Sequence, residues 1–157
     1  MAPRKGHTAA LQAAFLEELS ITSRKLRTLF DARVRAKGLT LARARTLIHL
    51  AKKDGMTQTE LAEILEVEGP TLVRLLDGLE KQGLTERRPV DGDRRAKQIA
   101  LTEAGRKLAA DVTLLGDELR EEVLTTVSEA DLIAATRAFR AIAQKIATVA
   151  GYQTDAA

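Results

Sequence analysis

Two short amphipathic stretches separated by only a few residues constrain this chain most strongly, and they lie between residues 57 and 83. Thr57 stands three residues before Glu60, a spacing at which each side chain bonds the backbone N–H of the other residue at a helix start. Apolar residues then recur on one face at helical spacing, namely Leu61, Ile64 and Leu65. This pattern predicts a short helix that ends near residues 66–68.

A second helix is predicted to begin almost at once. Gly69 loosens the turn, and Pro70 suits the first helical position because its missing N–H would have no partner there. Gly83 is expected to end the helix in a left-handed conformation. The inward face consists of leucines, namely Leu72, Leu75, Leu76 and Leu79. Two helices joined by such a short turn predict a helix-turn-helix, whose second helix enters the major groove of DNA.

The outward face of the second helix carries Thr71 and Arg74, followed by Asp77 and Gly78. Thr71 and Arg74 stand three residues apart in the first turns, where a recognition helix places the side chains that meet base edges. Arginine is well shaped for a bidentate contact to guanine. Taken alone, Arg74 is better explained as a solvated arginine on a helix surface, but the segment that follows reverses this preference.

That segment has the pattern of a basic β-hairpin. Residues 85–90 and 94–101 are predicted strands, and the Asp91, Gly92 and Asp93 turn between them contains a strong hairpin signal. Residues 87–97 hold five basic and two acidic side chains. A ribbon with arginines at its tip suits the narrow minor groove, and Asp93 is placed to hold the Arg95 guanidinium in an extended rotamer. The alternative is an exposed charged turn without a partner.

Together these segments predict a winged helix-turn-helix, and they resemble a known family. EVEGPTLVRLLDGLEKQGLTERR followed by DGDRRAKQIALTEAG is similar to the MarR family of bacterial transcriptional regulators, most closely its SlyA-like branch. The resemblance is specific over residues 39–105 and architectural outside them. The family's wing pattern matches Asp93, Arg95, Leu101 and Thr102, and its helix pattern matches Pro70, Thr71, Leu72, Val73, Arg74, Leu76, Asp77 and Leu79.

The resemblance implies how the protein meets DNA. Pro70, Thr71 and Arg74 would face the major groove, and Arg95 with Arg94 would enter the minor groove. Gly69 departs from the family, where a polar residue is more usual, so we expect no base contact there. The full set of candidate DNA-binding residues is Thr57, Gln58, Pro70, Thr71, Arg74, Arg87, Arg88, Arg94, Arg95 and Lys97.

Long apolar stripes flank this central domain. Residues 8–37 predict one long helix ended by Gly38, and Thr40 is expected to cap a second helix through Lys53. After the wing, Thr102 and Ser128 each precede another long amphipathic pattern. We expect a mainly α fold with a small two-stranded wing, divided into a disordered basic tail (1–8), a helical dimerisation region (9–38 and 103–150), the winged domain (39–102) and a frayed end (151–157).

The apolar stripes of the long helices are too extensive for the central domain to cover. The economical solution is a two-fold dimer in which the first and last helices of both chains interlock, which is also the arrangement in the resembled family. Two recognition helices would then read half-sites roughly 34 Å apart on a palindromic operator. The alternative is a monomer whose long helices pack on each other.

Composition excludes several classes of site. The chain has no cysteine, which removes disulfides, thiol-based peroxide sensing and cysteine zinc sites. His7 and His49 show no metal-binding spacing, so neither a metal nor a cofactor is predicted. No run of 18 apolar residues and no secretory leader can be recognised, so we expect a protein of the bacterial cytosol, associated with the nucleoid when bound to DNA.

Charge and aromatic content narrow the choice of partner. The net charge is +3, yet residues 87–107 alone carry seven basic and three acidic side chains, a footprint for a polyanion. Three Phe and one Tyr are too few for base-stacking platforms, so single-stranded nucleic acid is disfavoured. No catalytic constellation or phosphate loop can be recognised, which argues against an enzyme. An architectural DNA-binding protein and an effector-independent regulator remain alternatives to a repressor.

An effector site is suggested by the basic residues between Arg24 and Arg45 and by the resemblance. In the family, the junction of the first, second and fifth helices with the DNA-binding lobe holds small, often aromatic and anionic ligands. Phe30, Arg45 and His49 are the candidates to line such a pocket, with an aromatic carboxylate or its coenzyme A thioester as the inducer. Solvated helix faces, phosphate contacts and interhelix ion pairs are the alternative explanations.

Overall fold

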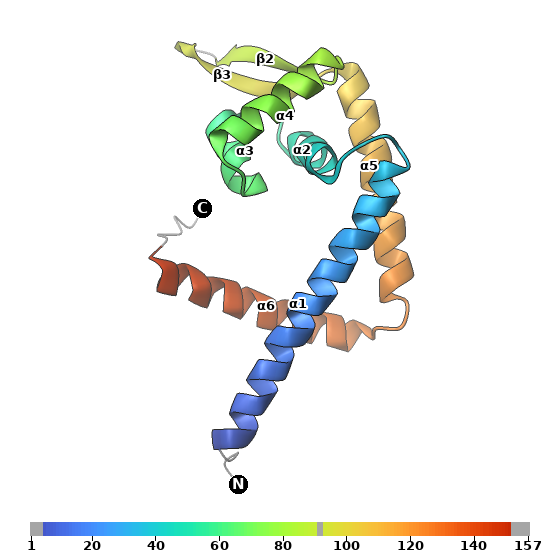
Figure 1. Ribbon diagram of the computed structural model, residues 1–157, viewed down its shortest axis with the longest axis vertical. Coiled ribbons are helices and arrows are strands. Elements are labelled where there is room, and N and C mark those ends of the chain that lie inside the picture. The colour runs from blue at the N-terminus through green and yellow to red at the C-terminus, as the bar shows by residue number, and fades with distance from the viewer. Residues whose placement is uncertain (1–4, 91–92, 152–157) are drawn as a thin grey trace. The chain divides into compact units, whose positions relative to one another are not determined.

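The computed structural model describes the backbone of residues 5–90 and 93–151 and the side chains of residues 8–89 and 97–151 (Figure 1). Its elements follow the order expected for a winged helix-turn-helix between long helices, and the mainly α fold is confirmed. They are α1 (Lys5–Arg35), α2 (Leu41–Lys52), β1 (Met56–Thr57), α3 (Gln58–Leu65), α4 (Gly69–Lys81), β2 (Thr85–Val90), β3 (Asp93–Leu101), α5 (Glu103–Leu124) and α6 (Glu129–Ala150). The chain forms two compact units, residues 1–119 and 120–157.

The start of α3 has the predicted capping box. The Thr57 hydroxyl accepts a hydrogen bond from the Glu60 N–H at 3.2 Å, and the Glu60 carboxylate accepts one from the Thr57 N–H at 2.7 Å. Of the three apolar residues that recur on one face, Leu61 and Leu65 are buried. Ile64 is 37% exposed. With eight residues, α3 has room for only a narrow buried stripe, and Ile64 lies at its margin.

The turn between α3 and α4 is as short as predicted. Glu66 takes a left-handed conformation at φ 56°, and Glu68 is the N-cap of α4 with Pro70 in the first turn. Leu72, Leu76 and Leu79 are buried, while Leu75 is half-buried against the same core. Gly83 has φ +69°, which confirms the expected left-handed residue just beyond the helix end.

The sheet has three strands, in the order β1-β3-β2, rather than the two predicted. The added strand β1 is antiparallel to β3 and pairs Met56 with Ile99 and Thr57 with Gln98. Two residues are too few to produce the period-two alternation that identifies a strand in a sequence. The β2–β3 hairpin forms as expected, with Thr85 opposite Leu101 and Arg87 opposite Ile99. Asp91 and Gly92 of the predicted turn lie outside the described residues.

The core of the first unit lies where α2, α3 and α4 meet the sheet and α5, as Figure 1 shows for these elements. Leu47, Leu50, Leu61, Leu76 and Ile99 are each at most 1% exposed. Thr40 caps α2 as predicted, since its hydroxyl accepts from the Arg43 N–H at 3.4 Å.

The first helix begins earlier than expected. Residues 5–8 of the predicted disordered tail belong to α1, so the prediction is wrong for them. Alanines and leucines follow at once in the sequence, and both residue types favour helix extension. Residues 1–4 of the tail lie outside the description, as do residues 152–157 of the predicted frayed end.

The predicted caps of the last two helices are both present. The Thr102 hydroxyl accepts from the Gly105 N–H at 3.0 Å and donates to the Gly83 carbonyl at 2.6 Å, which ties α5 to the end of α4. Ser128 accepts from the Asp131 N–H at 3.1 Å at the start of α6. Taken by itself, α6 has no buried residue, and Ile133, Ile146 and Val149 are 59%, 60% and 76% exposed.

Candidate nucleic-acid interface

The outward face of α4 carries the residues that the sequence predicts for base contact. Pro70, Thr71 and Arg74 are all exposed in the first turns of the helix. Thr71 and Arg74 are three residues apart, so they are neighbours on one helix surface. The leucines behind them anchor the opposite face in the core, so α4 presents this pair from a fixed backbone.

The wing lies beside α4, and β2 is the strand in contact with that helix (Figure 1). Lys97 is exposed on β3. The side chains of Arg94 and Arg95 lie outside the described residues, so their predicted entry into the minor groove stays a prediction.

Arg87 is bound to the recognition helix. Its Nη2 lies 2.6 Å from Asp77 Oδ1, and its Nη1 bonds the Glu80 carboxylate. Only 23% of its side chain is exposed. The Asp77 hydrogen bond is the main cause that raises the pKa of Arg87 above its ordinary value, so the guanidinium is always charged. Sequence reasoning grouped Arg87 with the DNA contacts and missed its two acidic partners.

Arg88 points to the other side of β2, and its partners are also acidic. Its Nε lies 2.7 Å from Glu86 Oε1, and its Nη1 lies 3.6 Å from Asp54 Oδ2. The pairs formed by Arg88 are exposed, and such pairs contribute little to stability. A phosphate could replace these carboxylates at small cost, so Arg88 remains available for the predicted DNA contact.

Thr57 and Gln58 stand at the start of α3, and both are half-buried. The Thr57 hydroxyl is held within the capping box, donating to Glu60 Oε2 at 3.0 Å while it accepts from the Glu60 N–H. Lys53 Nζ lies 2.6 Å from the other carboxylate oxygen. The bond from Lys53 and those from Thr57 lower the pKa of Glu60 from 4.5 to about 2, so its carboxylate keeps its charge well into the acid range.

The structure has a cleft between α2 and α5, and none of the three candidate effector residues lines it. Phe30 is half-buried against the core, and Arg45 Nη2 donates to the Ile64 carbonyl at 3.5 Å. His49 is half-buried, and burial, then Lys52 and Arg45, lower its pKa. A neutral imidazole is a weaker partner for an anion than the sequence hypothesis assumed.

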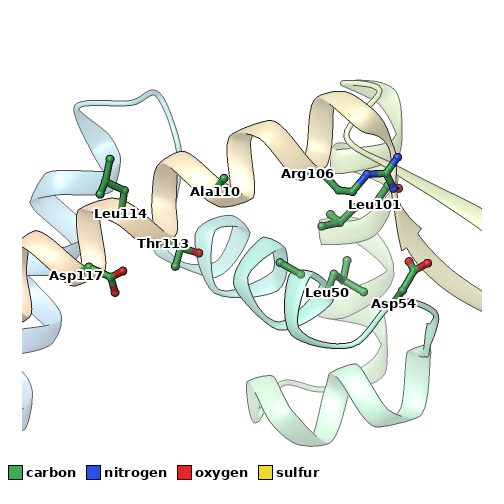
Figure 2. A pocket seen from close by; sticks show the side chains of 9 residues that line it. Leu50, Asp54, Leu101, Arg106, Ala110, Thr113, Leu114 and Asp117 are labelled. Carbon is green, nitrogen blue, oxygen red and sulfur yellow. The ribbon is translucent and has the colours of Figure 1, made fainter.

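The cleft itself has a volume of about 530 Å³. Figure 2 shows residues from the end of α2 facing residues of α5 across it. Arg106 stands at one end, where its Nη1 donates to the Leu101 carbonyl at 2.7 Å, and Asp117 stands further along α5. Its lining is Leu50, Ala51, Asp54, Leu101, Arg106, Ala110, Thr113, Leu114 and Asp117. These residues are spread over 68 positions of the chain, so no local sequence motif predicts the cleft.

The described residues offer neither a metal centre nor a membrane span. In that part of the chain no group of three or more His, Asp or Glu side chains could hold a metal ion. None of the helices described combines the length and hydrophobicity needed to span a bilayer.

Comparison with known proteins agrees with this geometry. A model of the MarR family matches residues 37–96. The solved structure of transcriptional regulator PA3341 is 42% identical, with 85% of this chain and 98% of that chain covered and a TM-score of 0.79. The DNA complex of Staphylococcus aureus MepR is 26% identical, with 84% and 97% covered and a TM-score of 0.72. The regulator SlyA shares the fold at 20% identity, with 85% and 94% covered and a TM-score of 0.74.

Proposed function

We infer that this chain, which belongs to the MarR family of transcriptional regulators, binds a palindromic operator as a homodimer and represses transcription from it. Family membership makes the chain a DNA-binding transcriptional regulator. The dimer, the operator symmetry, the repression and the effector are what we propose. One observation carries the proposal, namely a core-anchored α4 that exposes Thr71 and Arg74 beside a basic wing.

Each protomer would insert α4 in the major groove and place its wing against the adjacent minor groove. Arg74 is the residue we assign to base recognition, because its guanidinium can pair with both acceptors of a guanine. Lys97, Arg88 and the arginines of the wing tip would bind phosphates or the minor groove. Their contacts would make the affinity fall steeply with salt.

The apolar surface of the terminal helices supports the homodimer. On α1, Leu11 and Leu16 are 59% and 56% exposed, and α6 exposes Ile133, Ile146 and Val149. Large apolar side chains exposed in this number on long helices are what an interface with another protein surface would bury. We propose that a second copy of the chain covers both helices, so that two recognition helices are held at the spacing of two half-sites.

A binding assay at about 150 mM salt tests the DNA-binding proposal. Fragments from the region upstream of the protein's own gene should bind at least about 10³-fold more tightly than random duplex of equal length. A DNase footprint should then show a protected palindrome. Equal affinity for both duplexes would favour an architectural protein and contradict the proposal.

A small-molecule effector is the second candidate function, and the cleft between α2 and α5 favours it. We propose an aromatic carboxylate or its coenzyme A thioester as the ligand, with Phe30, Arg45 and His49 as the residues first assigned. Arg106 is a further basic group, located in the cleft itself. Titration of benzoate-type acids into the preformed operator complex tests the idea, and Arg45→Ala and Arg106→Ala distinguish the two positions. Failure of every acid tested to release DNA would contradict it.

A further inference from the structure

The contact between Arg87 and α4 has a consequence for how the protein reads DNA. Arg87 binds Asp77 and Glu80, two acids on consecutive turns of the recognition helix. We propose that Arg87 is a positioning residue that fixes the rotation of α4 about its axis and its position along that axis relative to the wing. Arg87 makes no DNA contact itself. The proposal rests on the DNA-binding function and assigns to this arginine a role opposite to the one expected from its charge.

The register of the sheet explains why Arg87 faces the helix. Arg87 pairs with Ile99 across the strands, and Thr85 pairs with Leu101. Residues two apart on a strand, and residues directly opposite across it, point to the same face of the sheet. Thr85, Ile99 and Leu101 are 3%, 1% and 2% exposed. Arg87 therefore stands at the end of a core-facing row, with its guanidinium extending towards α4.

The two acids continue a spiral row that starts at the residues that would read the bases and shifts around the helix by about 60° at each step of three residues. Thr71, Arg74, Asp77 and Glu80 follow one another at intervals of three, so each is a neighbour of the next on the helix surface. A guanidinium that bonds Asp77 and Glu80 together restrains the helix against rotation about its axis and against sliding along it. Thr71 and Arg74 then point in a direction set by the wing.

Electrostatics make a structural role the better explanation of the acids. Two carboxylates on a helix that approaches a polyanion repel it, and this cost needs an offsetting benefit. Asp77 is 59% and Glu80 41% exposed, so both carboxylates remain partly in solvent while they bond Arg87. The planar guanidinium of an arginine can bond two carboxylates at once, which a lysine ammonium cannot do with the same geometry.

Replacing Asp77 and Glu80 distinguishes a positioning role of Arg87 from a direct DNA contact, because the two roles predict opposite changes in DNA affinity. If Arg87 bound a phosphate, Asp77→Asn with Glu80→Gln would remove repulsion, release the guanidinium and tighten DNA binding. If Arg87 positions α4, the same double variant should weaken operator binding. The expected loss is on the order of tenfold, the equivalent of one charge-assisted hydrogen bond. It should also lower the ratio of operator to random-duplex affinity.

The experiment measures operator affinity by fluorescence anisotropy across a salt series. Glu63→Gln controls for the loss of one negative charge, half of what the double variant removes, because it changes α3 without touching the Arg87 contacts; it is the matched control for Asp77→Asn alone. Arg87→Met should weaken operator binding while the salt dependence keeps the parent's slope, whereas a lost phosphate contact lowers the slope by about 0.9. Arg87→Lys should bind the operator more tightly than Arg87→Met does but more weakly than the parent protein does. Circular dichroism verifies folding, and Asp77→Asn alone replaces the double variant if that one unfolds.

Three outcomes are distinct. Weaker binding by the acid-to-amide variant at an unchanged slope supports the positioning role. Tighter binding, or a reduced slope for Arg87→Met, overturns it while leaving the DNA-binding function intact. Absence of operator preference in the parent protein would instead remove the function on which the proposal rests.

Discussion

Gly105 packs directly against the backbone of Leu84, so closely that a Cβ atom added to Gly105 would lie 1.9 Å from the Leu84 carbonyl oxygen. This contact joins the first turn of α5 to the segment between α4 and β2. The Thr102 N–H donates to the same carbonyl at 3.1 Å, and the Thr102 hydroxyl donates to the Gly83 carbonyl. The end of the recognition helix and the start of α5 are therefore one rigid junction.

Gly105→Ala should destabilise the protein by about 1–3 kcal/mol, because the added methyl group meets backbone atoms that cannot rotate away. The matched control is Gly116→Ala in the same helix, where a Cβ would lie 3.9 Å from Phe30 in ordinary contact. That change should stabilise the folded protein by about 0.5–1 kcal/mol, because alanine has a higher helix propensity than glycine. Urea unfolding measures both, and equal effects of the two substitutions would contradict the close packing at Leu84.

Acid stability should depend on Glu60. Its pKa of about 2 in the folded protein lies below the ordinary 4.5. A lowered folded-state pKa contributes stability that is fully present above about pH 4.5 and is lost as pH falls towards 2. Glu60→Gln keeps an acceptor for the Thr57 N–H but removes the titrating carboxylate and its ion pair with Lys53. It should therefore flatten the unfolding free energy over this window and cost about 0.2–1 kcal/mol at neutral pH. Urea titrations from pH 2 to 7 test this, with Glu63→Gln as the control on the same helix.

Arg74 and Arg95 should differ in what they contribute to DNA binding. Arg74→Ala should lower discrimination between the operator and single-base variants by about 1–3 kcal/mol, because a bidentate base contact is lost. Arg95→Ala should weaken binding to every duplex and reduce the salt slope by about 0.9. Anisotropy titrations against a panel of mutated operators distinguish the two. Parent-like binding by both variants would contradict the assignment of the grooves.

The proposed dimer should be sensitive to charge on the apolar face of α6. Ile146→Glu places a carboxylate where the side chain is apolar and 60% exposed. The variant should sediment as a monomer at micromolar concentration and lose operator binding, because burial of an unpaired charge opposes association. Thr148→Glu adds the same charge at an exposed position about 200° around the helix from Ile146 and about four turns along it from Ile133, and should leave the dimer intact. Monomeric behaviour of the parent would remove the basis of the prediction.

Much of the winged helix-turn-helix was predictable from the residues. The capping box of Thr57 and Glu60, the left-handed Gly83 and the caps at Thr102 and Ser128 were all identified from short spacings. Each of these features depends on backbone geometry within about four residues, so the neighbouring residues in the sequence are enough to predict it. The position of Thr71 and Arg74 on the outer face of α4 follows from the leucine stripe by the same periodicity, and their role at DNA stays a prediction.

Contacts between distant residues were not predictable in this way. The strand formed by Met56 and Thr57 exists because Ile99 and Gln98 offer an antiparallel edge, and neither segment alone indicates it. Arg87 looked like a wing arginine for DNA until the fold brought Asp77 and Glu80 to it. The sequence by itself determined the helices and most of their ends and buried faces, because those are largely local properties of the backbone. Only the tertiary structure decided which charges meet, because an arginine's role depends on the partners that the fold places within its reach.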